Sequence, residues 1–253
     1  MPTPRHVSSP ISQRSTQRSA DALLRGPKPT INPFEVTLER LGSAIKMGLY
    51  EPGDQLPSER DIAKLMGISR ATVREAIRLL VEQGILTVKR GRSGGTFVSE
   101  NPPSEALLEL RRRLHTSGAT LSEILDHRLV VETGIVELAA QRAQADQLEE
   151  LQALVNVMQQ ADSYAVYRKL DIRFHLLIAK ATQTNRLPAI VADIHSELSD
   201  LLQTAPYSRS QQSHSTQQHQ EILDAMQQQD GVSAREVMQE HILATNSFLK
   251  GLL

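Results

Sequence analysis

The sequence predicts a mainly α-helical protein, with an N-terminal winged helix-turn-helix that includes a small β-hairpin and a C-terminal all-α bundle of about seven helices. Three observations carry this prediction. Two short stretches between residues 56 and 86 have apolar residues at helical spacing and are joined by a glycine. A basic, glycine-rich turn between two short β-like runs follows directly. Beyond residue 104, apolar residues recur at helical spacing without an alternating strand pattern.

Length and composition fit a protein of two domains. The chain has 253 residues and no cysteine, so it has no disulfide framework. No apolar run approaches the roughly 20 residues of a membrane span, and the N-terminus lacks the apolar stretch of a secretory signal. We therefore expect a cytoplasmic protein.

Charge is distributed unevenly along the chain, although the net charge is only −1. Residues 1–100 hold 15 Lys and Arg against 10 Asp and Glu, whereas the remainder holds 13 against 19. Excess positive charge attracts the phosphate backbone of nucleic acid. Because the basic part coincides with the helix-turn-helix, we expect that part to bind DNA.

Residues 1–32 are expected to form a flexible basic tail. They are rich in Ser, Thr, Pro, Gln and Arg and have almost no apolar period. The tail therefore lies outside the predicted core.

The first helix of the predicted helix-turn-helix spans residues 59–66. Ser58 can cap its beginning, and Gly67 can supply the left-handed residue that ends it. The residues expected on its apolar face are Ile62, Ala63 and Leu65.

The second helix begins after Ser69, which can cap it. Its core-facing residues are Val73, Ile77 and Leu80. Three cationic side chains project from the other side near its beginning: Arg70, Arg74 and Arg78. This arrangement is typical of a recognition helix, whose N-terminal residues reach base edges in the major groove.

A wing is predicted directly after the recognition helix. Residues 85–88 and 96–98 are short β-like runs, and residues 90–95 (RGRSGG) form a basic turn between them. Arginine can bond guanine bidentately or clamp a phosphate, and glycine lets the backbone approach a duplex closely. The alternative interpretation is a solvated helix face followed by an ordinary surface hairpin.

These residues resemble the winged helix of the GntR family of bacterial transcription regulators. The resemblance covers residues 34–98, and the stretch YEPGDQLPSERDIAKLMGISRATVREAIRLLVEQGIL is similar to the family signature throughout. It defines a DNA-binding domain over residues 33–98. The resemblance implies phosphate and base contacts at Arg60, Arg70, Arg74, Arg90, Gly91 and Arg92.

A linker is predicted over residues 99–104, where the paired prolines of ENPPS exclude helix. The second domain then occupies residues 105–253. Turn or capping residues divide it into helices expected at 105–115, 121–142, 146–162, 164–182, 187–204, 210–229 and 232–252.

A carboxylate and three imidazoles are candidate metal ligands in this second domain. Asp171 and His175 are four residues apart and so lie on one helical face, while His219 and His241 lie near the apolar faces of two other helices. Such nitrogen and oxygen ligands suit zinc, nickel, manganese or iron. From spacing alone, surface or satisfied core histidines are the alternative. His195 is a further candidate for a pocket residue, because its helix should pass near the bundle interior.

The helical part resembles the FCD effector domain of the FadR subfamily. That resemblance implies a divalent metal, with zinc favoured, held by Asp171, His175, His219 and His241. The stretch ILDHRLVVETGIVELAA is also similar to the family and implies an effector contact at Arg128. Asn185, which ends the family pattern after His175, is implied as a second effector-binding residue. One departure is Gln218, where a glutamate often precedes the family's histidine.

Together these features predict a ligand-responsive, DNA-binding transcription regulator and not an enzyme. We expect a repressor that binds a short palindromic operator as a homodimer and responds to a small organic carboxylate. An open metal position and Arg128 could each take an oxygen of that carboxylate.

Several alternatives remain at this point. The metal itself could be the signal, or it could be purely structural. A His/Asp metal-dependent hydrolase would need a general base beside the bound water and would leave the winged helix unexplained. An architectural DNA binder would show no response to any metabolite.

Overall fold

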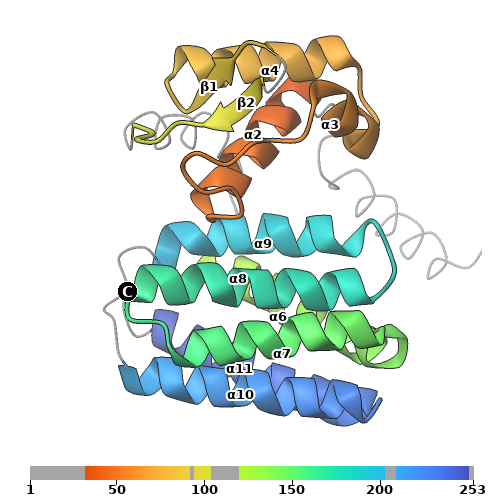
Figure 1. Ribbon diagram of the computed structural model, residues 1–253. Coiled ribbons are helices and arrows are strands. Elements are labelled where there is room, and N and C mark those ends of the chain that lie inside the picture. The colour runs from red at the N-terminus through yellow and green to blue at the C-terminus, as the bar shows by residue number, and fades with distance from the viewer. Residues whose placement is uncertain (1–31, 92–93, 104–119, 203–208, 251–253) are drawn as a thin grey trace, which may run out of the picture.

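The computed structural model describes residues 32–91, 94–103, 120–202 and 209–250, and Figure 1 shows a small upper domain above a helical bundle. Almost all of the tail predicted over residues 1–32 lies outside the described residues. The same holds for the helix predicted over residues 105–115 and for Arg92.

The upper domain is a winged helix-turn-helix, as the sequence predicts. Its elements are α2 (Pro33–Lys46), α3 (Glu59–Met66), α4 (Arg70–Glu82), β1 (Leu86–Lys89) and β2 (Gly95–Val98). Helix α2 packs on α4, and α3 packs on α4 as well. The core between them includes Leu38, Val73, Ile77 and Leu80, all buried.

The turn between α3 and α4 is built by the residues that the sequence singles out for it. The Ser58 side chain accepts a hydrogen bond from the Asp61 backbone at 3.3 Å and caps α3. Gly67 ends α3 with φ +66°, in the left-handed region that favours glycine. The Ser69 side chain accepts from the Thr72 backbone at 3.1 Å and caps α4. These predictions are confirmed.

The expectation that Leu65 belongs to the apolar face of α3 is wrong. Its side chain is 79% exposed, whereas Ile62 and Ala63 are buried and Met66 is partly buried. Successive helical residues are about 100° apart, so Ile62, Ala63 and Met66 share one stripe and Leu65 falls to the side of it. An eight-residue helix has only two turns and buries one narrow stripe.

The wing is an antiparallel hairpin in which Leu86 lies opposite Val98 and Lys89 lies opposite Gly95. At its tip Gly91 has φ +112°, a conformation that requires glycine. The Leu56 backbone donates a hydrogen bond to the Thr96 carbonyl at 2.8 Å and ties the segment before α3 to the hairpin.

The lower domain consists of helices in its described part, with bounds within a few residues of those predicted. They are α6 (Leu121–Arg142), α7 (Ala145–Gln159), α8 (Tyr164–Ala181), α9 (Leu187–Leu202), α10 (Arg209–Gln227) and α11 (Gly231–Lys250). Helix α6 packs against α8, α9 and α11, and α10 packs against α7 and α11. None of the described helices is both long and apolar enough to cross a bilayer.

The two domains meet where α9 faces the winged helix (Figure 1). The hydroxyl groups of Ser43 on α2 and Ser196 on α9 are 2.7 Å apart and share a hydrogen bond. Lys169 Nζ on α8 lies 3.4 Å from Glu51 Oε1 in the loop after α2. Both helices that approach the winged helix, α8 and α9, also line the interior of the bundle.

Candidate metal centre and DNA-binding surface

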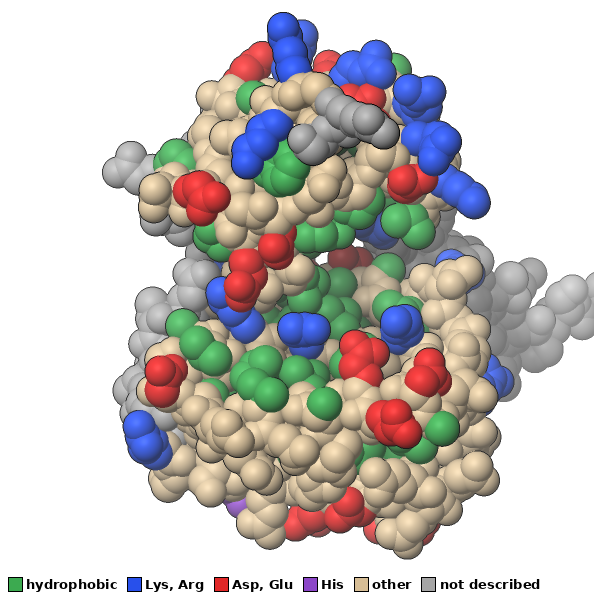
Figure 2. All heavy atoms as spheres, viewed as in Figure 1, with side chains coloured by type: hydrophobic (Ala, Val, Ile, Leu, Met, Phe, Trp, Pro, Cys, Tyr) green, Lys and Arg blue, Asp and Glu red, His purple; other side chains and the backbone are tan. Residues whose placement is uncertain are grey.

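Cationic side chains gather on the outer side of the winged helix, away from the bundle (Figure 2). Arg70 and Arg74 project from the exposed side of α4, and Arg90 stands at the wing tip beside Gly91. The family resemblance implies DNA contacts at Arg70, Arg74, Arg90 and Gly91, and all four residues are exposed.

Two of the arginines assigned to DNA also have acidic neighbours. Arg74 donates through Nη2 to Glu59 Oε2 at 2.9 Å and through Nε at 3.1 Å, which joins α4 to the beginning of α3. Arg60 Nε lies 3.5 Å from Asp61 Oδ1 and keeps a side chain that is 78% exposed. Arg60 therefore has an acidic neighbour next to it in the chain, but the contact is long.

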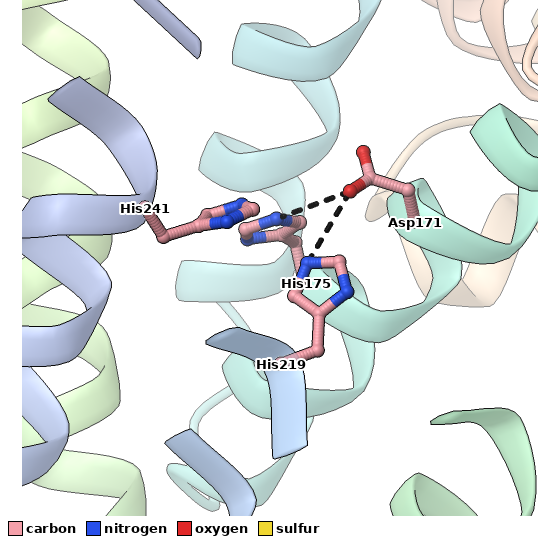
Figure 3. A group of neighbouring side chains, drawn as sticks. All are labelled: Asp171, His175, His219 and His241. Carbon is pink, nitrogen blue, oxygen red and sulfur yellow. Dashed lines mark ion pairs between the residues drawn. The ribbon is translucent and has the colours of Figure 1, made fainter. Parts of the chain in front are cut away.

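The four candidate metal ligands meet in the interior of the bundle. Asp171 and His175 lie one turn apart on α8, His219 comes from α10 and His241 from α11, and the side chains point toward one another (Figure 3). All four are buried, with exposures between 0% and 5%. Their ligand atoms lie within 4.8 Å of one another.

Distances within this group suit one shared ion. Asp171 Oδ1 lies 3.4 Å from His219 Nε2 and 3.8 Å from His175 Nε2. Two ligand atoms about 2.1 Å from the same zinc ion are at most about 4.2 Å apart. The four side chains would need to move only slightly closer together to bind one ion.

The imidazole nitrogens in this group lack the partners that buried polar atoms normally have. Nε2 of His175, His219 and His241 has no hydrogen-bond partner among the described residues, and neither has Nδ1 of His219. Nδ1 of His175 has one close polar neighbour, Glu132 Oε2 at 2.5 Å, although the two atoms are not ideally aligned. Native proteins rarely leave several such atoms orphaned in one place unless something else satisfies them. The donor set, three imidazoles and a carboxylate, is one that zinc and similar divalent ions accept. The residues therefore fit a metal ion.

Electrostatics favour neutral imidazoles at His219 and His241 and an ionised carboxylate at Asp171. Burial, followed by the charges of His219 and His175, holds the pKa of His241 well below its usual value. Burial also lowers the pKa of His219, although Asp171 opposes it. Burial raises the pKa of Asp171, but Arg168 and His219 outweigh it and hold that pKa well below the usual range. A neutral imidazole and a carboxylate are the forms that bind metals.

Two polar neighbours support these candidate ligands. Arg168 pairs with Asp171 Oδ2 and leaves Oδ1 toward the histidines. Gln218 Oε1 lies 3.3 Å from His241 Nδ1, so the position that departs from the family pattern still contacts a candidate ligand. An amide oxygen there accepts from Nδ1–H and leaves the Nε2 lone pair toward the group.

A second buried polar group adjoins the first through His175. Glu132 on α6 lies 2.5 Å from His175 Nδ1 through Oε2 and 3.2 Å from His195 Nε2 through Oε1. Arg128 donates from Nε to Glu132 Oε1 at 2.9 Å. Burial lowers the pKa of His195 to about 4, although Glu132 opposes it.

Sequence reasoning singled out Arg128 and noted His195 but missed Glu132. The available signal was spacing, because Glu132 follows Arg128 by four residues and so shares its helical face. Its contact with His175 depends on packing between α6 and α8. Asn185, by contrast, lies exposed in the connection between α8 and α9, and the structure does not bring it into either buried group.

Comparison with protein families gives two matches that divide the chain as the structure does. Residues 35–98 match the bacterial regulatory proteins of the gntR family, and residues 123–244 match the FCD domain. The first covers the winged helix and the second covers most of the helical bundle.

Relatives extend over most of the chain. The Exu regulon transcriptional regulator of Escherichia coli K12 is 31% identical over 219 residues, which cover 83% of this chain and 81% of that protein. Another protein of the same strain, named for regulation of an L-lactate dehydrogenase operon, is 29% identical over 224 residues and 84% of each chain. Among solved structures, Escherichia coli McbR/YncC has the same fold, with a TM-score of 0.51 and 20% identity over 88% of this chain and 99% of that one.

Proposed function

Because the chain belongs to the GntR family of bacterial regulatory proteins and carries an FCD domain, we propose that it is a metal-containing repressor that responds to a small organic carboxylate. As a member of this family it is a DNA-binding transcription regulator and not an enzyme. The repressor role, the metal and the effector class are the proposal. One observation carries it: three imidazoles, each with an Nε2 atom that lacks a hydrogen-bond partner among the described residues, converge with a carboxylate inside the effector domain.

We propose that Asp171, His175, His219 and His241 hold one divalent ion, with zinc favoured. When bound there, the ion supplies a Lewis-acid position that accepts an anionic oxygen. The side chains come from α8, α10 and α11, so the bound state links three helices.

Arg128 supports a carboxylate as effector. It is almost fully buried, and its Nε donates to Glu132. A guanidinium has four further N–H donors on its two terminal nitrogens, which can bond a second carboxylate. A relative named for an L-lactate dehydrogenase operon is consistent with this class, since L-lactate is a small carboxylate.

We propose that effector binding affects DNA binding through the helices that carry the metal ligands. Helix α8 carries Asp171 and His175 and also Lys169, which meets Glu51 of the winged-helix domain. We propose that two chains form a dimer with its recognition helices on two half-sites, and that the effector changes their spacing. A difference of about 1 to 3 kcal/mol in effector affinity between two arrangements would change DNA occupancy by roughly 5- to 150-fold.

Metal analysis of alanine variants tests the site. Each of Asp171→Ala, His175→Ala, His219→Ala and His241→Ala is expected to lower metal content and the melting temperature, because binding the ion adds to the free energy of unfolding. His127→Ala is the matched control, since His127 is exposed on α6, and it should change neither quantity.

Measurements of operator binding test the proposed response to a carboxylate. Small carboxylates are added to the protein on a palindromic operator at saturating zinc. Under that condition Arg128→Ala is expected to remain metal-loaded and to lose the response. Full metal occupancy in His219→Ala and His241→Ala would refute the metal site. If the site holds metal but no carboxylate alters DNA binding, the effector class is wrong.

A further inference from the structure

Glu132 lies at the centre of the second buried polar group, which the proposed ion does not use. The carboxylate is 2% exposed and contacts side chains from three helices. Oε2 meets His175 Nδ1 on α8 at 2.5 Å, while Oε1 meets His195 Nε2 on α9 at 3.2 Å. Arg128 Nε, one turn away on α6, donates to Oε1 at 2.9 Å.

His175 belongs to both buried groups, with one ring nitrogen in each. Its Nε2 faces Asp171 Oδ1 at 3.8 Å, and its Nδ1 faces Glu132. A neutral imidazole has one N–H and one lone pair, so the partner that takes the N–H also decides where the lone pair points. An ionised carboxylate can only accept. If Nδ1–H donates to Glu132, the lone pair is on Nε2, on the side of the candidate ligands.

A second ion between Glu132, His175 and His195 is the competing interpretation, because their ligand atoms are also close together. The position of Arg128 argues against it. The guanidinium is permanently charged and bonds the carboxylate oxygen that a second ion would need. His175 would also have to give up its remaining proton to serve two ions at once. Of the two groups found among the described residues, one is therefore left as an ion site.

We propose that Glu132 is a positioning residue for the metal site, which accepts a hydrogen bond from His175 Nδ1 and thereby holds the Nε2 lone pair toward Asp171. Arg128 and His195 keep the Glu132 carboxylate in place. This inference rests on the metal site of the proposed function. A carboxylate behind a metal-bound histidine fixes the tautomer and orientation of the ring and strengthens the bond to the metal.

Metal affinity of full-length variants gives the first test. Glu132→Gln keeps the size of the side chain and one acceptor oxygen but removes the charge. We expect zinc affinity, measured by competition with a chelator, to fall about 10- to 100-fold. Glu137→Gln is the matched control, because Glu137 is on the same helix and meets Arg235 at the surface at 3.5 Å. Its zinc affinity should equal that of the unaltered protein.

The tautomer of His175 gives a second test, and its first measurement uses the unaltered protein. In the zinc-loaded protein with nitrogen-15 in its histidines, NMR should place the proton of His175 on Nδ1. In Glu132→Gln the Nδ1–H signal should move upfield, because the acceptor is no longer charged. A purely structural role for Glu132 would lower the melting temperature without moving this signal.

Three outcomes would overturn the proposal even if the protein binds a metal ion. They are unchanged zinc affinity in Glu132→Gln, a His175 proton on Nε2, and two ions per chain of which one is lost in that variant. If the unaltered protein binds no ion, the metal part of the proposed function fails together with this inference.

Discussion

Arg70 and Arg74 occupy the same exposed side of α4 but differ in what they contact. Arg74 is bonded to Glu59 at 2.9 Å, with a side chain that is still 63% exposed. No ion pair in the described part of the chain involves Arg70. Arg70 can therefore reach DNA directly, whereas Arg74 must first exchange a carboxylate for a phosphate or base.

We expect Arg70→Ala to weaken operator binding more than Arg74→Ala does. A lost base contact would cost about 1 to 3 kcal/mol, and a lost phosphate contact would lower the salt slope by about 0.9. Glu59→Gln should strengthen binding, because it frees Arg74 and removes a negative charge near the phosphates. Fluorescence anisotropy across a salt series measures all three variants.

Arg235→Ala is the control for the two arginine variants, since it removes the same charge from α11, at the opposite end of the molecule. If Arg70→Ala has the affinity and salt slope of the unaltered protein, α4 does not contact DNA in the expected way.

At the level of single elements, α6 depends on the cap at its beginning. The Thr120 hydroxyl accepts from the Glu123 backbone at 3.3 Å, and Glu123 Oε2 accepts from the Thr120 backbone at 2.7 Å. This capping box satisfies donors that would otherwise lack a partner at the helix terminus. Helix α6 carries Arg128 and Glu132 further along, so the cap helps to hold the helix that supports both buried groups.

Thr120→Ala should lower the free energy of unfolding by about 1 kcal/mol. The bonds from Thr120 lower the pKa of Glu123. The contribution of Glu123 to the free energy of unfolding is therefore fully present above the usual carboxyl pKa. It is lost as pH falls through the lowered pKa. Thermal unfolding at neutral and acidic pH measures both effects. Ser122→Ala, an exposed change in the same turn, is the control, and equal melting of the two variants would contradict the prediction.

The sequence predicts elements well and contacts between them poorly. The helix expected over residues 121–142 is found at Leu121–Arg142, because Thr120 is a strong cap and turn residues bound the segment. Asp171 and His175 could be paired from their spacing on one helix. The contact of Glu132 with His175 could not, because it joins residues 43 positions apart and depends on how α6 packs against α8. The exposure of Leu65 was missed because small angular differences decide what a short helix buries.

At the scale of the whole molecule, the contact between the two domains gathers negative charge. Burial and the nearby Asp193 raise the pKa of Glu39 on α2, and burial raises the pKa of Asp193 and Glu197 on α9. Arg40 and His127 oppose these shifts without cancelling them. A raised carboxyl pKa means that the folded protein binds the proton more tightly than the unfolded chain does. The contact is therefore most stable below the usual carboxyl pKa and weakens as pH rises through the raised values.

Asp193→Asn should strengthen the contact at neutral pH and reduce its dependence on pH. Spin labels on engineered cysteines, one in each domain, would report this as a narrower distance distribution in pulsed EPR. The chain has no native cysteine to interfere. Asp224→Asn, on the distant α10, is the control. Distances that respond neither to pH nor to Asp193→Asn would show that these charges do not govern the contact.

Helix α9 presents neighbouring residues to two different parts of the molecule. His195 meets Glu132 inside the bundle at 3.2 Å, and Ser196 meets Ser43 of the winged-helix domain at 2.7 Å. A rotation of α9 about its own axis by about 20° would carry a side-chain atom, about 5 to 6 Å from that axis, through about 2 Å. A displacement of that size breaks a hydrogen bond. Because the two contacts come from neighbouring residues, a ligand that rotated α9 by such an angle from inside the bundle would also break the Ser196–Ser43 hydrogen bond to the DNA-binding domain.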